Sequence, residues 1–290
     1  MLIWPDCIPC ILRMSLGVAR LAIRDDEGMR GFLQEVLRLS PLKGEDWNVT
    51  SPEVIRDVWT IMQQLSGETD PLKGIKEEQN RQALELLPLA REQVLGSHDP
   101  LEEAVKFAIA ANSIDAMINP REATEGIFEI LQGHGIDPLE MRQFEERLRR
   151  ARTVVYLGDN CGEIVFDRLL IETIRDRYEL DVVFVTRTLS VLNDATLQDA
   201  TSVGMGEVAA VAENGIPEPL PGTVLQKASP ELKALMEEGD LIISKGGGNY
   251  DSLTEEGRMK GRVTFLFQAK CYPYCSLHRL PLGGLIVYNH

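Results

Sequence analysis

Three short polar sequences in the second half of the chain each follow an apolar run rich in β-branched residues. GDNCGE (158–163) comes directly after TVVYL, NDATLQDA (193–200) comes shortly after DVVFVT, and KGGGN (245–249) comes directly after DLIIS. In open α/β sheets, ligands bind in the crevice where strands end and helices begin. Helix starts usually favour anions, so an acidic residue there is explained if a cation lies between the protein and an anionic ligand.

Asp159, Asn160 and Asp194 offer two carboxylates and an amide oxygen, which are hard oxygen ligands. Such ligands suit Mg²⁺ or Mn²⁺ with water molecules completing an octahedron, and they suit thiolate-loving ions poorly. The sequence therefore predicts a divalent-metal site at these strand ends. Taken alone, the Asp-Asn-x-Gly motif would be explained more simply as a turn with a helix cap.

Lys245 and the glycines that follow it form the third polar sequence. A lysine charge together with backbone N–H groups at a strand end can close on phosphate oxygens. The arrangement is neither a Walker A loop nor GxGxxG, because the lysine precedes the glycines. Taken alone, a flexible loop between a strand and a helix explains it as well.

The elements that must position these residues fall into two parts. From about residue 5 to residue 150, apolar residues recur at helical spacing, with breakers such as Asp99-Pro100 and Asp137-Pro138 between the runs. After residue 150, short apolar runs alternate with helical stretches, which predicts a mostly parallel sheet covered by helices. The predicted strands are TVVYL (153–157), DVVFVT (181–186), EVAAV (207–211), DLIIS (240–244), VTFLFQA (263–269) and GLIVYN (284–289).

We therefore expect an α/β protein with a helical N-terminal domain over residues 1–150 and an α/β domain over residues 151–290 that carries the metal site. The formal net charge of −15 argues against nucleic acid or an anionic membrane as a partner. The sequence has no apolar run of the roughly 18 to 20 residues that would span a bilayer, and no signal-peptide pattern at its start. The expected location is the cytoplasm.

The order and spacing of several blocks resemble the damage-control phosphatase family over nearly the whole chain. The resemblance implies a three-layer, Rossmann-like α/β/α sandwich with a helical N-terminal bundle. It also implies a phosphatase that uses Mn²⁺, Ni²⁺, Co²⁺ or Mg²⁺ to hydrolyse small phosphorylated metabolites, often sugar phosphates or damaged metabolites. The N-terminal block CIPC (7–10) resembles the prokaryotic branch of the family, which has paired cysteines. The other blocks are DPLKGIKEEQN (70–80), AANSIDAMI (110–118), GDNCGEIVFD (158–167), NDATLQDA (193–200) and KGGGNYDSL (245–253).

Residue by residue, the resemblance implies that Asp159, Asn160 and Asp194 hold the metal and that Lys245 contacts phosphate. Asp159 and Lys245 are thus the expected catalytic residues. The remaining residues of these motifs that are expected to bind substrate are Gly162, Glu163, Gly246 and Asn249.

Asn112 and Asp115 lie three residues apart on a helix face otherwise made of alanine and isoleucine. A hydrogen-bonded pair in the core would explain them. The resemblance instead implies that both bind substrate. In the DPLKGIKEEQN block, Asp70, Lys73 and Lys76 are weaker candidates, for which an exposed, capped helix start is the expected structure.

Five cysteines without a secretion signal argue against a disulfide framework. Cys7 and Cys10 form C-x2-C, and Cys271 and Cys275 form C-x3-C, but the gap between the pairs is unlike compact zinc modules. Cys7 and Cys10 are a candidate second metal or redox site, with simple burial of apolar thiols as the alternative.

Several mechanisms and functions stay open at this point. The nucleophile could be a metal-bound water, or Asp159 itself through an aspartyl phosphate. A carboxylate methyltransferase using S-adenosylmethionine is the main alternative enzyme, although GDNCGE lacks the glycine-rich spacing expected for that ligand. A non-catalytic metabolite-binding or metal-binding protein on the same fold is the other.

Overall fold

The computed structural model describes the whole chain except residues 112–126, 128–129 and 132. Its centre is a six-stranded sheet in the order β3-β2-β1-β4-β5-β6, in which all neighbouring strands are parallel except β5 and β6. The predicted mostly parallel sheet is confirmed. The strands are β1 (Thr153–Leu157), β2 (Asp181–Thr186), β3 (Ala210–Glu213), β4 (Leu241–Lys245), β5 (Val263–Gln268) and β6 (Leu285–Asn289).

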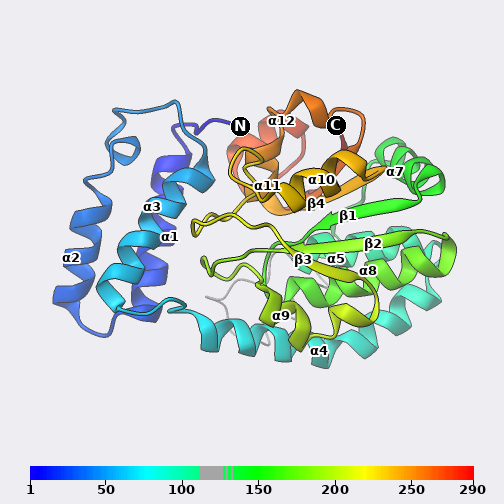
Figure 1. The fold of residues 1–290 in the computed structure, drawn as a ribbon, viewed down its shortest axis with the longest axis horizontal. Helices are drawn as coiled ribbons and strands as arrows, with labels where there is room; N and C mark the ends of the chain where they lie inside the picture. Colours follow the sequence, from blue (N-terminus) through cyan, green and yellow to red (C-terminus); the bar gives the residue numbers. More distant parts are fainter. Residues whose placement is uncertain (112–126, 128–129, 132) are drawn as a thin grey trace.

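Helices cover both faces of the sheet, which gives the three-layer α/β/α arrangement seen in Figure 1. One face is covered by α4, α5, α7, α8 and α9, and their buried side chains form a single apolar cluster with the strands. The other face is covered by α10, α11 and α12, which share a second cluster with β4 and β5. These helices are α4 (Lys73–Gly96), α5 (Pro100–Ala110), α7 (Pro138–Arg150), α8 (Glu163–Arg177), α9 (Leu197–Ser202), α10 (Pro230–Glu238), α11 (Gly246–Leu253) and α12 (Tyr272–His278).

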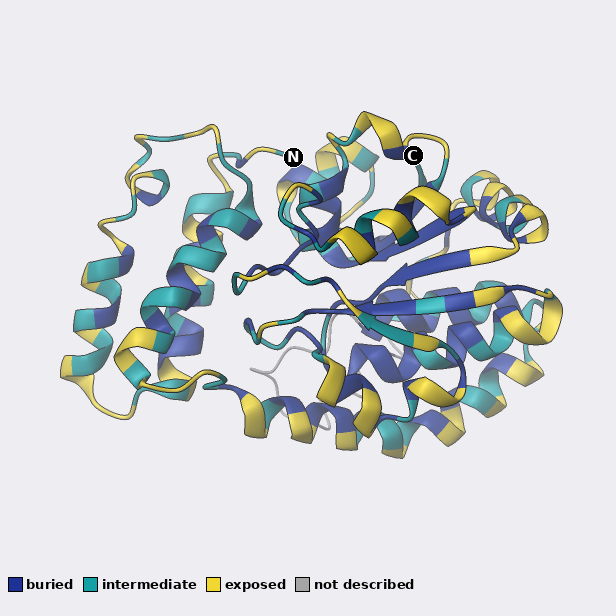
Figure 2. Ribbon diagram, viewed as in Figure 1, coloured by how far each residue is buried: buried dark blue, intermediate teal, exposed yellow. Residues whose placement is uncertain are grey.

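The N-terminal bundle is a separate body of three helices at one end of the sheet, beside the loops that follow the strands (Figure 1). Its core, in which Phe32, Trp59 and Met62 are fully buried, also includes Val191 from the loop after β2. The central strands of the sandwich are likewise buried (Figure 2). The bundle consists of α1 (Cys7–Ala22), α2 (Asp26–Val36) and α3 (Ser51–Ser66). Short 3-10 turns lie in the bundle at Pro41–Lys43 and in the sandwich at Met205–Glu207 and Gly257–Met259.

The boundary expected at residue 150 marks the change from helices to alternating strands and helices. Side-chain packing changes earlier. The core of the bundle includes Leu72, whereas Ala83 and the later residues of α4 pack on the sheet. The helices α4, α5 and α7 therefore belong to one layer of the sandwich. In the described part of the chain, no helix is both long enough and apolar enough to cross a membrane.

Local sequence explains where the helices begin. Asp99 and Asp137 each cap a helix whose first residue is proline, as their spacing predicts. At α3 the cap is Thr50, which forms a reciprocal capping box with Glu53. Asp70-Pro71 is different, because α4 starts only after Leu72 and Asp70 pairs instead with a lysine side chain.

Candidate active site

The order of the strands reverses between β1 and β4, and this is where the polar sequences meet. The helix after β1, α8, lies on one face of the sheet, and the helix after β4, α11, lies on the other (Figure 1). The two connections therefore diverge and leave a crevice at the carboxyl edge of the sheet, the usual ligand site of such folds. Asp159 follows β1 by two residues, and Lys245 ends β4.

The structure brings Asp159, Asn160 and Asp194 together. Asn160 and Asp194 form an isolated antiparallel β-bridge, and the backbone N–H of Ala195 donates to the carbonyl oxygen of Asp159 at 2.8 Å. Leu192, just before these residues, has a φ of 46°, which is unusual for a non-glycine residue and costs energy. The loop after β2 is thus held in a strained shape that aligns it with the loop after β1.

Arg187, the first residue after β2, joins these groups and was not predicted. Its side chain is 3% exposed. Nε donates to Asp194 at 2.6 Å, Nη2 to Asp159 at 3.3 Å, and Nη1 to Oδ1 of Asn249 at 2.9 Å. The amide nitrogen of Asn249 donates in turn to the carbonyl oxygens of Gly158 and Lys245. The sequence feature that could have indicated this role is a basic residue directly after a predicted strand, near acidic residues that need a positive charge beside them.

The two carboxylates are poorly compensated by the protein itself. Burial raises the pKa of Asp159 to about 8, and Asp194 and Glu163 act in the same direction, against the opposing effect of Arg187. Burial also raises the pKa of Asp194, although Arg187 opposes it. A divalent cation placed between such carboxylates would favour their ionised forms.

The donor set fits a hard divalent cation that keeps several other ligands. Two carboxylates with water and a phosphate oxygen are the usual surroundings of Mg²⁺ in proteins. Asn160 now turns its Nδ2 towards Asp159, at 2.8 Å, so coordination through Oδ1 requires a rotation of the amide. Among the residues that the structure describes, no group of three or more His, Cys, Asp or Glu is arranged to hold a metal ion.

Lys245 lies beneath the crevice and is fully buried. Its Nζ donates to Glu163, to Asp167 at 2.6 Å and to the carbonyl oxygen of Ala108 at 2.8 Å. Tyr156 donates to the same oxygen of Asp167 at 2.7 Å. Burial acts to lower the pKa of Lys245, but Asp167 and Glu163 outweigh it and raise the pKa.

This arrangement separates Lys245 and Glu163 from Asp159, Asn160 and Asp194. They pair with each other, and a phosphate would have to displace a carboxylate to reach Nζ. Their contact with substrate stays a prediction. Glu163 retains a link to the crevice, since Asn160 Nδ2 lies 3.4 Å from its Oε2.

The glycines are required by close packing rather than by flexibility. A Cβ at Gly246, whose φ is +77°, would lie 1.9 Å from a carboxylate oxygen of Asp159. A Cβ at Gly248 would lie 1.9 Å from the carbonyl oxygen of Pro221. Gly162 also has a positive φ, +78°, and its N–H donates to Asn80 Oδ1 at 2.7 Å.

Asn80 belongs to the DPLKGIKEEQN block, whose role is partly different from the one expected. The exposed helix start is wrong for Lys76, which is 1% exposed and pairs with Asp199 at 2.8 Å and Asp70 at 3.1 Å. Lys73 is exposed, as expected. The block thus contacts the loop after β1 and stabilises it through the hydrogen bond between Asn80 and Gly162. Asn112 and Asp115 lie outside the described residues.

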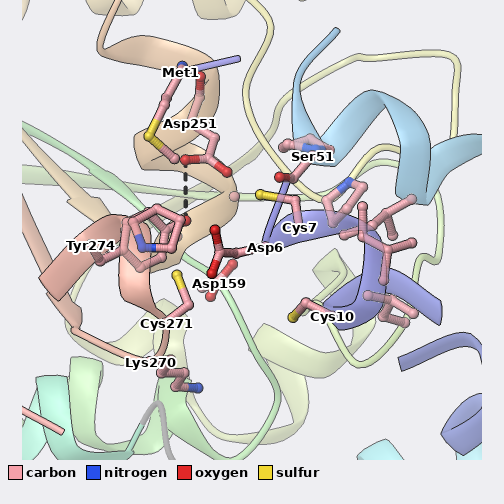
Figure 3. A pocket seen from close by; sticks show the side chains of 18 of the residues that line it. Met1, Asp6, Cys7, Cys10, Ser51, Asp159, Asp251, Lys270, Cys271 and Tyr274 are labelled. Atoms are coloured by element: carbon pink, nitrogen blue, oxygen red, sulfur yellow. Dashed lines mark hydrogen bonds between the residues drawn. The ribbon is translucent and has the colours of Figure 1, made fainter. Parts of the chain in front are cut away.

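A cavity of about 270 Å³ opens above Asp159, Asn160 and Asp194, between the sandwich and the bundle. The thiols of Cys7, Cys10 and Cys271 line the same cavity, and Figure 3 shows them around the carboxylates of Asp6 and Asp159. All three cysteines are free thiols. The proximity of these cysteines to Asp159 was not predicted, because they are far from it along the chain.

Buried carboxylates and a glycine-rich helix start at the reversal of strand order define a Rossmann-like α/β/α protein with a candidate small-molecule site at the carboxyl edge of its sheet. Residues 3–286 match the family described as the damage-control phosphatase ARMT1-like domain. The chain belongs to this family.

Three archaeal relatives cover nearly all of the chain. An uncharacterized protein of Methanocaldococcus jannaschii is 33% identical, with 98% of this chain and 94% of its own covered. A damage-control phosphatase of Archaeoglobus fulgidus is 31% identical over 99% and 98%. The damage-control phosphatase PH1575 of Pyrococcus horikoshii is 26% identical, with 97% of this chain and 96% of its own covered. The crystal structure of PH1575, described as a DUF89 family protein, superimposes over all of both chains with a TM-score of 0.86. The names of the second and third relatives support a phosphatase role.

Proposed function

We propose that the protein is a divalent-metal-dependent phosphatase acting on phosphate monoesters of small metabolites, sugar phosphates or damaged phospho-metabolites. One observation carries this proposal. The described side chains that line the cavity include the carboxylates of Asp6, Asp159, Asp194 and Asp251 but, among basic side chains, only that of Lys270. A divalent cation bound among these carboxyl groups would favour their ionised forms and would add the positive charge that attracts a phosphate dianion, which the described side chains lining the cavity supply only through Lys270.

The cation, held by Asp159, Asn160 and Asp194, would supply positive charge that polarises the phosphate. The chain's own groups orient that phosphate. Gly247 and Gly248 line the cavity in the first turn of α11, where backbone N–H groups have no acceptor within the helix and can donate to phosphate oxygens.

Water is the nucleophile that we propose. Both carboxylate oxygens of Asp159 already have partners, Oδ1 in Arg187 and Oδ2 in Asn160. The contact with Asn160 is released when Asn160 rotates to bind the metal, but attack by Asp159 would still require it to leave Arg187 or to give up its role as a metal ligand. A water molecule in the cavity would break no contact of the protein in approaching the phosphorus atom. Arg187 acts as a positioning residue, because it joins Asp159 to Asp194 and touches no cavity space itself.

The first test is metal removal. EDTA-treated protein should not hydrolyse 4-nitrophenyl phosphate, and Mn²⁺, Co²⁺, Ni²⁺ or Mg²⁺ should restore turnover. Asp194→Asn removes one ligand charge, so the Mn²⁺ concentration for half-maximal activity should rise at least about tenfold, with partial recovery in excess Mn²⁺. Asp181→Asn, an exposed position at the start of β2, is the matched control.

Full turnover in protein shown by elemental analysis to be metal-free would contradict the proposal. The same assay separates the alternatives. A methyltransferase would transfer a methyl group from S-adenosylmethionine and release no phosphate, and a non-catalytic binding protein would do neither. The names of the relatives do not favour the methyltransferase.

A further inference from the structure

The cavity has two unlike ends. At the sheet, Asp159, Asn160 and Asp194 are polar and face the proposed phosphate position. Away from the sheet, the walls come from α1, α3, the loop after β2 and the segment around α12. The apolar side chains on these walls include Met1, Ile11, Pro52, Ile55, Leu192, Pro273 and Tyr274.

Hydroxyl groups on the apolar walls are already used. Tyr274 donates to Asp251 at 3.1 Å, and Ser51 also hydrogen bonds to Asp251, which is itself 3% exposed (Figure 3). Among the described lining residues, the remaining charged side chains are Lys270, which is exposed, and Asp6, whose carboxylate lies beside that of Asp159 (Figure 3). A leaving group rich in hydroxyls would lose water there and regain few hydrogen bonds.

The three thiols on these walls favour a different kind of ligand. Cys7, Cys10 and Cys271 are weak hydrogen-bonding groups, and sulfur makes favourable contacts with aromatic rings. Burial raises the pKa of Cys10 and raises that of Cys271 to about 11, so both are neutral thiols at pH 7. At about 270 Å³, the cavity is slightly smaller than the roughly 300 to 1,000 Å³ of sites for drug-sized ligands.

We propose that the bundle end of the cavity is a leaving-group subsite that selects phosphate monoesters of compact apolar alcohols, aromatic ones above all, over those of polyhydroxylated sugars. The inference rests on the proposed phosphatase function and narrows its substrate class. In the reaction, the water oxygen bonds to phosphorus, the ester P–O bond breaks, and a proton that the water gives up passes to the departing alkoxide oxygen, giving the alcohol and inorganic phosphate.

The test compares substrates with similar leaving groups. Benzyl phosphate and glycerol 3-phosphate are both esters of primary alcohols, so their intrinsic reactivity differs little and the comparison reports binding of the organic part. With Mn²⁺ present, kcat/KM for benzyl phosphate should exceed that for glycerol 3-phosphate and for glucose 6-phosphate by roughly tenfold or more.

A matched pair of variants places the preference on the bundle wall. Ile55 and Ile61 lie on α3 and are both half-buried against the bundle core, but only Ile55 lines the cavity. Ile55→Asn should lower the ratio of kcat/KM for benzyl phosphate over glycerol 3-phosphate by about tenfold. Ile61→Asn should leave that ratio within about twofold.

Equal or better turnover of the sugar phosphates, or an equal change of the ratio in Ile61→Asn, would overturn the inference. Failure of the proposed function looks different, because then no ester releases phosphate with any metal. In that case calorimetry with benzylphosphonate and 2-hydroxyethylphosphonate, which have no ester bond, still decides the matter. Tighter binding of benzylphosphonate, weakened by Ile55→Asn, supports the apolar subsite, and equal binding of the two overturns it.

Discussion

The sandwich side of the cavity and the bundle side differ in what holds them in place. On the sandwich side, Arg187 joins Asp159 to Asp194, and Gly246 packs so tightly on Asp159 that no Cβ fits. On the bundle side, Ile55 comes from a helix that packs around a separate core. The chemistry therefore depends on a fixed network of buried charges, whereas selectivity depends on side chains that can change one at a time.

The largest effect should come from the charge network under the sandwich side. Lys245→Met leaves Glu163 and Asp167 buried without their cation, which should cost about 3 to 5 kcal/mol of unfolding free energy. Urea denaturation at pH 7 measures it. Lys73→Met, at an exposed lysine, should change stability by less than about 0.5 kcal/mol.

A loss below about 1 kcal/mol in Lys245→Met would contradict the buried pairing. It would favour a lysine that reaches towards phosphate in the cavity, as the family resemblance implies.

Arg187→Lys should have the next largest effect, because a lysine cannot reproduce the three-way fork to Asp194, Asp159 and Asn249. Losing part of these charge-assisted bonds, each worth about 1.5 to 3 kcal/mol, should lower kcat/KM by roughly tenfold to a hundredfold. A metal titration should also show weaker Mn²⁺ binding, since both carboxylates lose their orientation. Unchanged metal affinity with reduced kcat would show that Arg187 acts on substrate instead.

The control for that variant is Arg262→Lys. Arg262 donates to backbone carbonyl oxygens at the end of α10, including that of Gly239 at 3.0 Å, and lies outside the cavity. Its replacement should alter stability without changing the Mn²⁺ titration.

A smaller effect should appear in the pH dependence of stability. Burial raises the pKa of Asp167 to about 7 despite the opposing charge of Lys245, compared with about 3.9 in an unfolded chain. The folded state therefore binds more protons between about pH 4 and 7, and the contribution of this group to stability is lost as the pH rises through that window. From pH 5 to pH 8, Asp167→Asn should lose less stability than the unaltered protein.

Urea midpoints at the two pH values give this comparison, with Asp176→Asn, at an exposed position on α8, as the control. A pH slope in Asp167→Asn equal to that of the unaltered protein would show that Asp167 is ionised throughout the range.

The smallest effect is expected on the bundle side. Cys7→Ser with Cys10→Ser should keep turnover of 4-nitrophenyl phosphate within a few fold, because the thiols line the cavity but do not belong to the oxygen-ligand site. Complete loss of catalysis in a folded double variant would show that the thiols take part in the reaction. The proposed difference between the sandwich side and the bundle side of the cavity would then be wrong.

The strands and their direction could be predicted because short β-branched runs separated by helical stretches leave few alternative folds. The strand predicted at 207–211 lies instead at Ala210–Glu213, after a 3-10 turn at Met205–Glu207. Helical periodicity identified α4, α5 and α7, but it does not say which surface a helix will cover, so their packing on the sheet could not be foreseen.

The site was predictable where the residues follow their own strand ends, as Asp159 and Asp194 do. The direction of the Lys245 side chain was not predicted, although it follows from the alternation of side chains along a strand. Ile243, two residues earlier, packs among the helices α5 and α8, and Lys245 points to the same face of the sheet. The approach of Cys7 and Cys10 to Asp159 depends on how the bundle sits beside the sheet, which no spacing within the sequence encodes.

The separate core of the bundle also has an evolutionary consequence. Mutations that reshape the wall formed by α1 and α3 leave the side chains on the faces of the sheet in place, since those belong to other apolar clusters, but such mutations reach the loop after β2 through Val191, which is part of the bundle core. Descendants of such a gene could therefore acquire new substrates through changes within roughly the first 70 codons, provided that the contacts with Val191 are kept.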